Sequence, residues 1–175
     1  MTHEVLAPDC VLYAEDEFGF FANACIVYGT LVAPCHVAAG NPLFLAPRTG
    51  EAARVPLKKV PQRVDLAYSN DLLTATGFEV TSEALVGESL SILGYRGQDH
   101  TPFEIIVTVL ELLPNGRIKV QRLSGEKAAV GMSGSPAVNI HGELVGILVA
   151  GVENSPDNEQ LYLESIANLD LGGTL

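Results

Sequence analysis

The sequence lacks tryptophan and contains only three cysteines, Cys10, Cys25 and Cys35, among its 175 residues. Small secreted domains that depend on disulfides carry more cysteines, usually in an even number. The amino-terminal residues also lack the basic stretch and apolar run of a secretory signal peptide. We therefore expect a protein of a reducing, cytoplasmic compartment.

Positive charge is scarce as well, because 10 Lys and Arg residues face 21 Asp and Glu residues, for a net charge of −11. Such a chain is poorly suited to bind phosphate backbones or anionic membrane surfaces, so we expect no nucleic-acid partner. Hydrophobic residues make up 47% of the chain and charged residues 18%, which excludes a disordered chain or a coiled coil. The length fits one domain, or two half-size lobes packed as a unit.

One long stretch has no charged side chain apart from a histidine: Phe18 to Pro47 contains no Lys, Arg, Asp or Glu. Its length would suit a transmembrane helix. However, it contains Asn23, Pro34, His36 and several glycines, together with many β-branched and aromatic residues. This composition is typical of short buried strands joined by turns, and we expect no membrane segment in this chain.

Short apolar runs recur along the chain, separated by turn signals and without regular alternation with helices. This pattern favours an all-β sandwich or barrel over a parallel α/β sheet. The more polar stretch 71–88 is expected to connect a lobe of residues 1–80 to a lobe of residues 81–175. The expected strands are Phe18–Ala22, Cys25–Val32, Leu43–Ala46, Arg54–Leu57, Val64–Tyr68, Leu90–Leu93, Phe103–Leu112, Ile118–Arg122, Ala137–Ile140, Leu144–Val149 and Leu161–Ile166.

Two neighbouring strands allow a prediction of burial. Phe103–Leu112 has apolar residues at both odd and even positions, so we expect both of its faces to be buried. After the turn at Pro114–Gly116, Ile118–Gln121 alternates apolar and polar residues, as a half-exposed partner strand would.

The segment Gly131–Pro136, with the sequence GMSGSP, is the most informative motif. Glycines on either side of Ser133 allow a sharp turn that exposes the hydroxyl and directs successive N–H groups at one point, where an oxyanion can form. An ordinary β-turn is the alternative, because Gly and Ser are common in loops.

A base and an acid can be assigned to the first lobe. Of the four histidines, only His36 lies among apolar neighbours, which could hold its imidazole neutral as a general base. A structural histidine is the alternative. Asp65 interrupts the apolar run Val64–Tyr68, and a buried carboxylate needs a partner such as an imidazole N–H. Asp71 is the fallback acid.

In this order, the segments resemble those of the chymotrypsin-like serine endopeptidases. Gly29–Val37 is similar to the strand and turn that carry the catalytic histidine, Asp65–Ala67 to the aspartate segment and Gly131–Pro136 to the nucleophile loop. Gly142–Ile147 is similar to the strand that returns beside the nucleophile.

The resemblance implies two antiparallel six-stranded β-barrels with the active site in the cleft between them. It implies a catalytic triad of His36, Asp65 and Ser133, and an oxyanion hole formed by Gly131, Met132 and Ser133. A polypeptide would be the substrate, and no metal or other cofactor would be required.

The departures from the family pattern also carry information. Met132 occupies the place where zymogen-activated members have an aspartate, so we expect no activation by that route. Cys35 is not expected to be the nucleophile. The three cysteines with His36 could suggest zinc, but no Cys-x-x-Cys spacing supports that hypothesis.

The resemblance also assigns the primary specificity pocket. Leu148 stands where viral relatives that cleave after Gln or Glu commonly have a histidine, which argues against a preference for those residues. We expect the substrate residue before the scissile bond to be small or medium and apolar or, failing that, acidic and drawn by Lys127. The predicted pocket walls are Lys127, Ala128, Ala129, Val130, Leu148, Val149, Ala150 and Gly151.

The branch of the family is less defined. Small size, few cysteines and the GMSGSP loop resemble the serine main proteases of positive-strand RNA viruses, which process polyproteins in the host cytoplasm. Gly94–Gly97 and Asn139–Gly146 resemble instead bacterial heat-shock-type proteases and their stand-alone cytoplasmic relatives. A protease-fold module without activity that binds peptides is a further alternative. The sequence does not define the oligomeric state.

Overall fold

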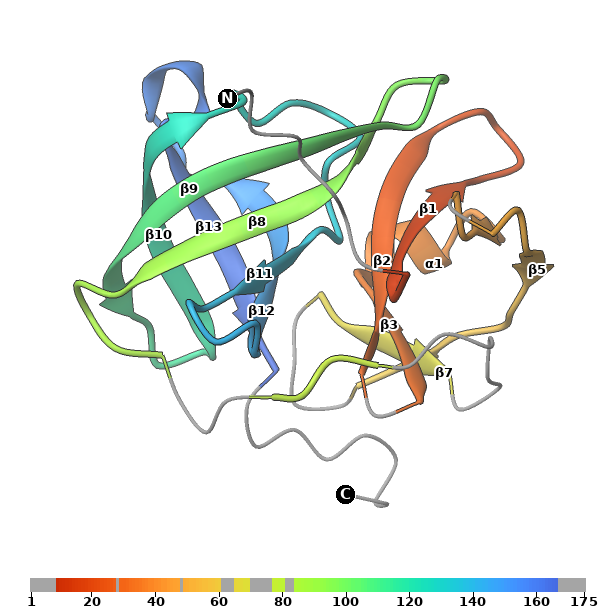
Figure 1. Cartoon of the computed structure of the whole chain (residues 1–175), viewed down its shortest axis with the longest axis horizontal. Coiled ribbons are helices and arrows are strands. Elements are labelled where there is room, and N and C mark those ends of the chain that lie inside the picture. Colours follow the sequence, from red (N-terminus) through yellow and green to blue (C-terminus); the bar gives the residue numbers. More distant parts are fainter. Residues whose placement is uncertain are drawn as a thin grey trace.

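The computed structural model describes residues 9–27, 29–47, 49–60, 65–69, 77–80 and 84–166. Its regular structure is almost entirely antiparallel β-strand, arranged as a seven-stranded amino-terminal sheet beside a closed six-stranded barrel (Figure 1). The all-β class with two β units confirms the prediction. No helix in these described ranges is long and apolar enough to cross a membrane.

The amino-terminal sheet has the strand order β5-β4-β1-β2-β3-β7-β6. It differs from the expected six-stranded barrel in its strand count, and in the described part of the chain β5 and β6 at its two ends do not pair with each other. The strands are β1 (Val11–Glu15), β2 (Phe21–Val27), β3 (Thr30–Ala33), β4 (Leu43–Leu45), β5 (Ala52–Arg54), β6 (Lys58–Lys59) and β7 (Ala67–Ser69).

The carboxy-terminal barrel has the order β10-β13-β12-β11-β8-β9, and it closes because β9 also pairs with β10. A single 3₁₀ turn, η1 (Pro156–Asn158), precedes its last strand. The barrel strands are β8 (Ser89–Arg96), β9 (Thr101–Leu112), β10 (Arg117–Gly125), β11 (Pro136–Val138), β12 (Leu144–Gly151) and β13 (Gln160–Ser165).

Strand β9 corrects one prediction of burial. Phe103, Ile105, Val107 and Val109 are buried inside the barrel, but the alternate residues are only half-buried or exposed. The expectation that both faces are buried was therefore wrong, because the outer face of this strand stays open to solvent. The half-exposed alternation expected at the start of β10 is confirmed, since Ile118 and Val120 point inward and their neighbours do not.

Several strand boundaries also differ from the predictions. Cys25–Val32 is not one strand: β2 ends at Val27, and Gly29, with φ of +77°, makes the tight turn into β3. Strand β1 was not among the expected strands, although its apolar run is at least as long as that of Leu43–Ala46. Phe18 lies in a turn rather than in a strand, and Ile140 is 85% exposed in the turn after β11.

The two units share apolar contacts. The barrel has a core of its own, whereas the core of the amino-terminal sheet also includes Tyr95, Leu144 and Ile147 from the outer surface of the barrel. Two bridges in the expected connector reinforce this contact, because Phe78 pairs with Val27 and Val80 with Leu144. Residues 71–76 and 81–83 of the connector, Asp71 among them, lie outside the described residues.

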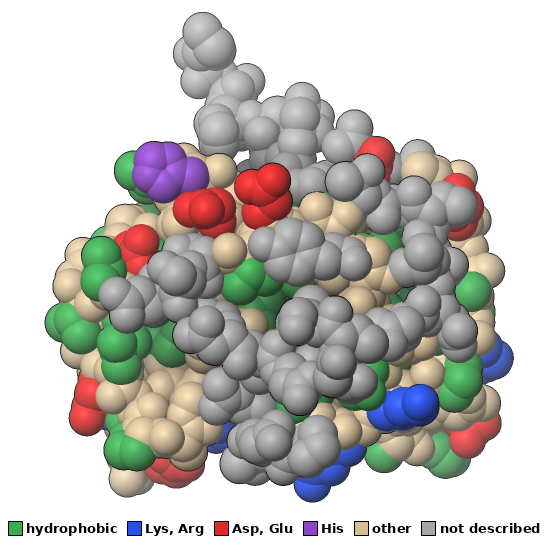
Figure 2. Space-filling model, turned by 90° about the horizontal axis from the view of Figure 1, so that it is seen from below, with side chains coloured by type: hydrophobic (Ala, Val, Ile, Leu, Met, Phe, Trp, Pro, Cys, Tyr) green, Lys and Arg blue, Asp and Glu red, His purple; other side chains and the backbone are tan. Residues whose placement is uncertain are grey.

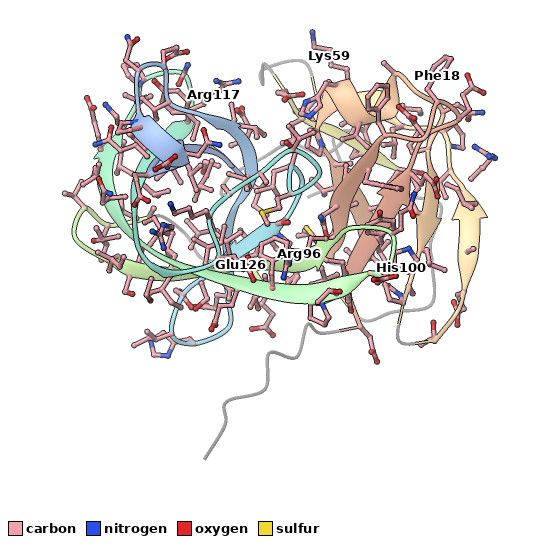
Figure 3. The ribbon with its side chains drawn as sticks, turned by 90° about the horizontal axis from the view of Figure 1, so that it is seen from above. Phe18, Lys59, Arg96, His100, Arg117 and Glu126 are labelled. Atoms are coloured by element: carbon pink, nitrogen blue, oxygen red, sulfur yellow. The ribbon has the colours of Figure 1, made fainter. Side chains whose placement is uncertain are left out.

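Charge is distributed over the surface in line with the acidic composition. In Figure 2, Asp and Glu side chains are spread over the visible face, whereas the Lys and Arg side chains in view lie near its lower and right-hand edges. Arg96 of β8 and Glu126 form an ion pair at 3.2 Å on the barrel, where Figure 3 labels both.

Candidate active site

The histidine and the aspartate of the predicted triad come together at the edge of the amino-terminal sheet. β3 ends at Ala33, Pro34 is extended with ψ of 147°, and the single-turn helix α1 (Cys35–Ala38) then presents His36. Asp65 precedes β7, the neighbour of β3. His36 Nδ1 lies 2.7 Å from Asp65 Oδ2, and the His36 backbone N–H donates to Asp65 Oδ1 at 3.1 Å.

The environment of this pair is polar and asymmetric. The Asp65 side chain is only 15% exposed, whereas the His36 side chain is 51% exposed, so the expected apolar surroundings of the imidazole are not present. Burial acts to raise the pKa of the Asp65 carboxyl. The hydrogen bonds and charge of His36, with the backbone N–H groups of His36 and Cys35, outweigh burial and hold that pKa below its usual value.

The GMSGSP segment, Gly131–Pro136, belongs to the barrel and begins in the loop between β10 and β11. Ser133 and Ser135 both lie in this loop, but Ser135 is fully buried and its hydroxyl donates to the Met132 carbonyl at 2.6 Å. Ser133 is half-buried and lines the same cavity as His36. Of the two serines, only Ser133 is therefore placed to meet a substrate beside the histidine.

Two backbone N–H groups of this loop are unused. In the part of the chain that the structure describes, neither the Gly131 N–H nor the Ser133 N–H donates to a protein acceptor. The Met132 N–H, by contrast, donates to Ala129 O at 3.2 Å, and Gly131 has a φ of +100°. Met132 was predicted to line the oxyanion hole, but its amide is already occupied; Gly131 and Ser133 hold the free donors.

Two cavities meet at Ser133. One, of about 300 Å³, extends over the amino-terminal sheet and is lined by Ala14, Asp16, Phe20, Phe21, Ala22, His36, Val37, Val130, Gly131 and Ser133. The other, of about 170 Å³, lies over the barrel and is lined by Ala128, Ala129, Val130, Ser133, Leu148, Ala150, Gly151, Asn158 and Leu161. The candidate nucleophile therefore has a separate space on each of two sides.

No protein-family model and no curated protein sequence matches the chain. Solved structures are similar to it. The inactive form of the Rv3671c protease of M. tuberculosis matches with a TM-score of 0.73 and 14% identity, over 94% of this chain and 86% of that one. Kallikrein-related peptidase 10 matches with a TM-score of 0.74 and 16% identity, over 92% and 91% of the two chains.

A viral structure also matches: the protease of tobacco vein mottling virus, with a TM-score of 0.67 and 13% identity, over 95% of this chain and 83% of that one. The chain has the fold of the chymotrypsin-like serine proteases. At these identities the likeness shows the fold alone, and the chemistry of the chymotrypsin-like fold here has to be argued from this chain's own residues.

The smaller cavity lies within the predicted specificity pocket of the chymotrypsin-like fold, with two differences. Lys127 does not line it, because its ammonium group instead lies 3.5 Å from the Asp157 carboxylate, and both side chains are exposed. Val149 is buried but does not line it either. Alternation along β12 explains the second difference, since neighbouring residues of a strand face opposite ways.

Asn158 is a pocket residue that sequence reasoning missed. Its Nδ2 donates to Ala128 O at 3.1 Å, and its Oδ1 would lie 2.6 Å from a Cβ at Gly151, so a side chain at position 151 would displace this amide. Asn158 has a φ of +53°, a conformation that asparagine tolerates better than most residues. The turn signal at 155–158 was visible in the sequence, but its contact with the pocket was not.

Asn23 was also missed, although it holds the two units together at the site. This fully buried side chain on β2 donates to Tyr95 O at 2.9 Å and to Gly131 O at 3.1 Å, and accepts from the Tyr95 N–H at 2.8 Å. Its backbone N–H donates to Ser133 O at 2.7 Å. A polar residue inside an apolar strand was the available signal.

The loop that carries Ser133 approaches β2 so closely at position 134 that a glycine is required there. Gly134 has a φ of +93°, and a Cβ there would collide with the carbonyl oxygen of Asn23. The Gly134 N–H donates to Leu148 O at 2.6 Å, so the loop is fixed to β12 as well. The glycine after the serine in GMSGSP therefore has a geometric reason in this structure.

The cysteines take no part in the cavities. All three are free thiols, and Cys35 donates to Leu66 O at 3.1 Å. Burial, followed by the nearby Asp65 charge, raises the pKa of the Cys35 thiol, which keeps it protonated. Among the described residues, no three His, Cys, Asp or Glu side chains lie close enough together to hold a metal ion.

Proposed function

We propose that the chain is a serine endopeptidase that hydrolyses peptide bonds through Ser133, His36 and Asp65. The observation that carries the proposal is the double contact of Asp65 with the imidazole and the backbone N–H of His36. An ionised carboxylate at Nδ1 favours the tautomer that leaves Nε2 free to accept a proton. The lowered pKa of Asp65 supports this, because it keeps the carboxylate ionised at neutral pH.

In this mechanism, Nε2 of His36 takes the Ser133 hydroxyl proton while Oγ attacks the scissile carbonyl carbon. The developing oxyanion accepts hydrogen bonds from the free N–H groups of Gly131 and Ser133. His36 then delivers the proton to the leaving amine, and water hydrolyses the acyl-enzyme by the same steps. Because the base must be neutral, activity should rise from acid toward neutral pH.

The smaller cavity would take the side chain on the acyl side of the scissile bond. Its walls are apolar apart from Asn158 and Ser133, and no acidic residue lines it within the described part of the chain. A small or medium apolar residue suits these walls, and cleavage after Arg or Lys does not. The acidic alternative loses support, because Lys127 pairs with Asp157 outside the cavity.

The finer prediction, processing of a viral polyprotein, stays a prediction. The similar solved structures include both a bacterial and a viral protease, so they do not favour either branch. The alternative of a peptide-binding module without activity also stays open, and covalent labelling distinguishes it.

A fluorophosphonate probe tests the proposal, because it reacts covalently only with an activated serine. We expect labelling of the native chain and peptide cleavage, with loss of both in Ser133→Ala and a fall in turnover of about 10⁴-fold or more. Ser124→Ala, at an exposed serine on β10, is the matched control and should be labelled normally. Labelling that survives in Ser133→Ala would reject the assignment, and a folded native chain that is never labelled would favour the binding module.

A further inference from the structure

Most of the larger cavity lies beyond the three lining residues, His36, Gly131 and Ser133, that the proposed chemistry uses. Most of its lining is apolar, contributed by Ala14, Phe20, Phe21, Ala22, Val37 and Val130, and the residues that close one end are His36, Gly131 and Ser133. Phe20 is 68% exposed and Val130 is fully exposed. Large apolar side chains at the mouth of a cavity are unfavourable in water unless a ligand covers them.

Hydrogen bonds fix the backbone of the loop that carries Phe20 without any ligand. Asp16 Oδ1 accepts the backbone N–H groups of Phe18 and Phe20, each at 2.9 Å, and the Asp16 N–H donates to Phe20 O at 2.9 Å. The loop is also joined to the segment after α1, where the Glu17 N–H donates to Gly40 O at 3.2 Å. A ligand that covers Phe20 therefore has little loop entropy to overcome.

The position of the cavity defines which ligand it meets. Ser133 and Val130 line both cavities, but the other walls of the larger cavity come mainly from the amino-terminal unit and those of the smaller cavity from the barrel, so the two extend from Ser133 over different units. When the scissile carbonyl of a peptide lies at Ser133, the acyl segment extends to one side of the nucleophile and the leaving segment to the other. If the smaller cavity takes the acyl side, the larger cavity receives the residue that follows the scissile bond.

We propose that the larger cavity is a leaving-group subsite that selects a bulky apolar residue directly after the scissile bond, with Phe20 as its main specificity determinant. This inference rests on the proposed peptidase function. Apolar walls favour Leu or Phe over Gly through buried area, and they disfavour charged residues through the cost of desolvation. The Asp16 carboxylate lines the cavity too, but its Oδ1 is engaged by the loop.

Acyl transfer measures this subsite separately from the acyl side. The enzyme is acylated with the p-nitrophenyl ester of an N-acylated alanine, and amino-acid amides then compete with water for the acyl-enzyme. The amine nitrogen attacks the acyl carbonyl and loses its proton to His36. The bond from the carbonyl carbon to Ser133 Oγ breaks, and His36 returns the proton to Oγ. The readout is the ratio of new amide to hydrolysed acid.

We expect leucinamide and phenylalaninamide to be used about tenfold better than glycinamide, argininamide or glutamate α-amide. Phe20→Ala should reduce this discrimination several-fold. The matched control is Phe18→Ala, because Phe18 is an exposed phenylalanine of the same loop that does not line the cavity. Figure 3 places Phe18 at the outer edge of the amino-terminal unit, away from the barrel.

Each result has a defined meaning. Equal use of all the amides, preference for argininamide, or equal losses in Phe20→Ala and Phe18→Ala would overturn the inference while leaving the peptidase proposal standing. If the ester releases no burst of p-nitrophenol and a fluorophosphonate does not label the native chain, the proposed function itself fails, and the inference fails with it.

Discussion

The two β units differ in how they complete their cores. The barrel closes on itself, and all members of its core come from residues 84–163. The amino-terminal sheet has strands as short as two residues and fills its core partly with side chains from the outer surface of the barrel, among them Leu144 and Ile147. Because apolar burial is the main stabilising contribution, the sheet depends on the barrel more than the barrel depends on the sheet.

This asymmetry bears directly on the site. The proposed nucleophile and oxyanion donors stand on the closed barrel, whereas the proposed base and acid stand on the sheet. Asn23 connects the two through hydrogen bonds to Tyr95, Gly131 and Ser133. The relative position of His36 and Ser133 therefore depends on the shared core and on hydrogen bonds between the units, among them those of Asn23, rather than on either unit alone.

The strongest test of the comparison is a large cavity in each core. Phe103 in the barrel and Phe44 in the sheet are both essentially fully buried. We expect Phe103→Ala and Phe44→Ala each to lower the free energy of unfolding by about 3–5 kcal/mol. Because the sheet needs the barrel surface, both variants should unfold in a single urea transition, monitored by far-ultraviolet circular dichroism and by tyrosine fluorescence.

Two unfolding transitions would instead mean that the two units unfold independently. If Phe44→Ala produced two transitions, with the barrel melting at the native midpoint, the sheet would be an independent folding unit. Phe103→Ala should never show the reverse, a folded sheet beside an unfolded barrel. That result would contradict the dependence inferred from the shared core.

The next effect in size concerns the connection between the units. Asn23→Ala removes the hydrogen bonds of this side chain to the Tyr95 backbone and to the Gly131 carbonyl, which should cost about 1–3 kcal/mol. Peptidase activity should fall further than the loss of stability explains, because the loop that carries Ser133 loses its side-chain attachment at Gly131 and keeps only the backbone bond from Asn23 to Ser133. Activity is measured at a temperature where the variant remains folded.

Asn139→Ala provides the matched control. Asn139 is also a buried asparagine, but within the described residues its side chain bonds to its own turn, to His141 and Glu143. A comparable loss of stability with normal activity is expected. Equal losses of activity in the two variants would mean that Asn23 has no special role in positioning the site.

The smallest expected effect is a pH dependence of stability from Asp65. Its pKa is lower in the folded chain than the unfolded value of about 3.9. The ionised group therefore stabilises the fold above that pH, and the contribution is lost as the pH falls through the lower folded value. The stability difference between the native chain and Asp65→Asn should shrink as urea midpoints are measured from pH 6 to about pH 3.

The opposite pH dependence of this stability difference would contradict the prediction. A gap that stays constant, or widens in acid, would mean that the Asp65 carboxylate is not held ionised by His36.

Much of the architecture could be read from the sequence because it depends on local pattern. Short β-branched runs between Gly, Pro and Asn turns predicted the all-β class, and the alternation at the start of β10 predicted its half-burial. The boundaries of β2 and β3 were wrong because one glycine, Gly29, divides a continuous apolar run. Burial on β9 was wrong because composition does not say which face of a strand a neighbouring unit covers.

The sequence by itself determined which side chains could do chemistry, since a serine between glycines and an aspartate in an apolar strand stand out against their neighbours. Only the tertiary structure decided which of them meet. Asn23 lies 72 residues from Tyr95 and 108 from Gly131, and no local pattern couples such distant positions. The occupied amide of Met132 and the exclusion of Lys127 from the pocket likewise depend on loop geometry. Hydrogen bonds and packing form between surfaces that exist only after the chain has folded.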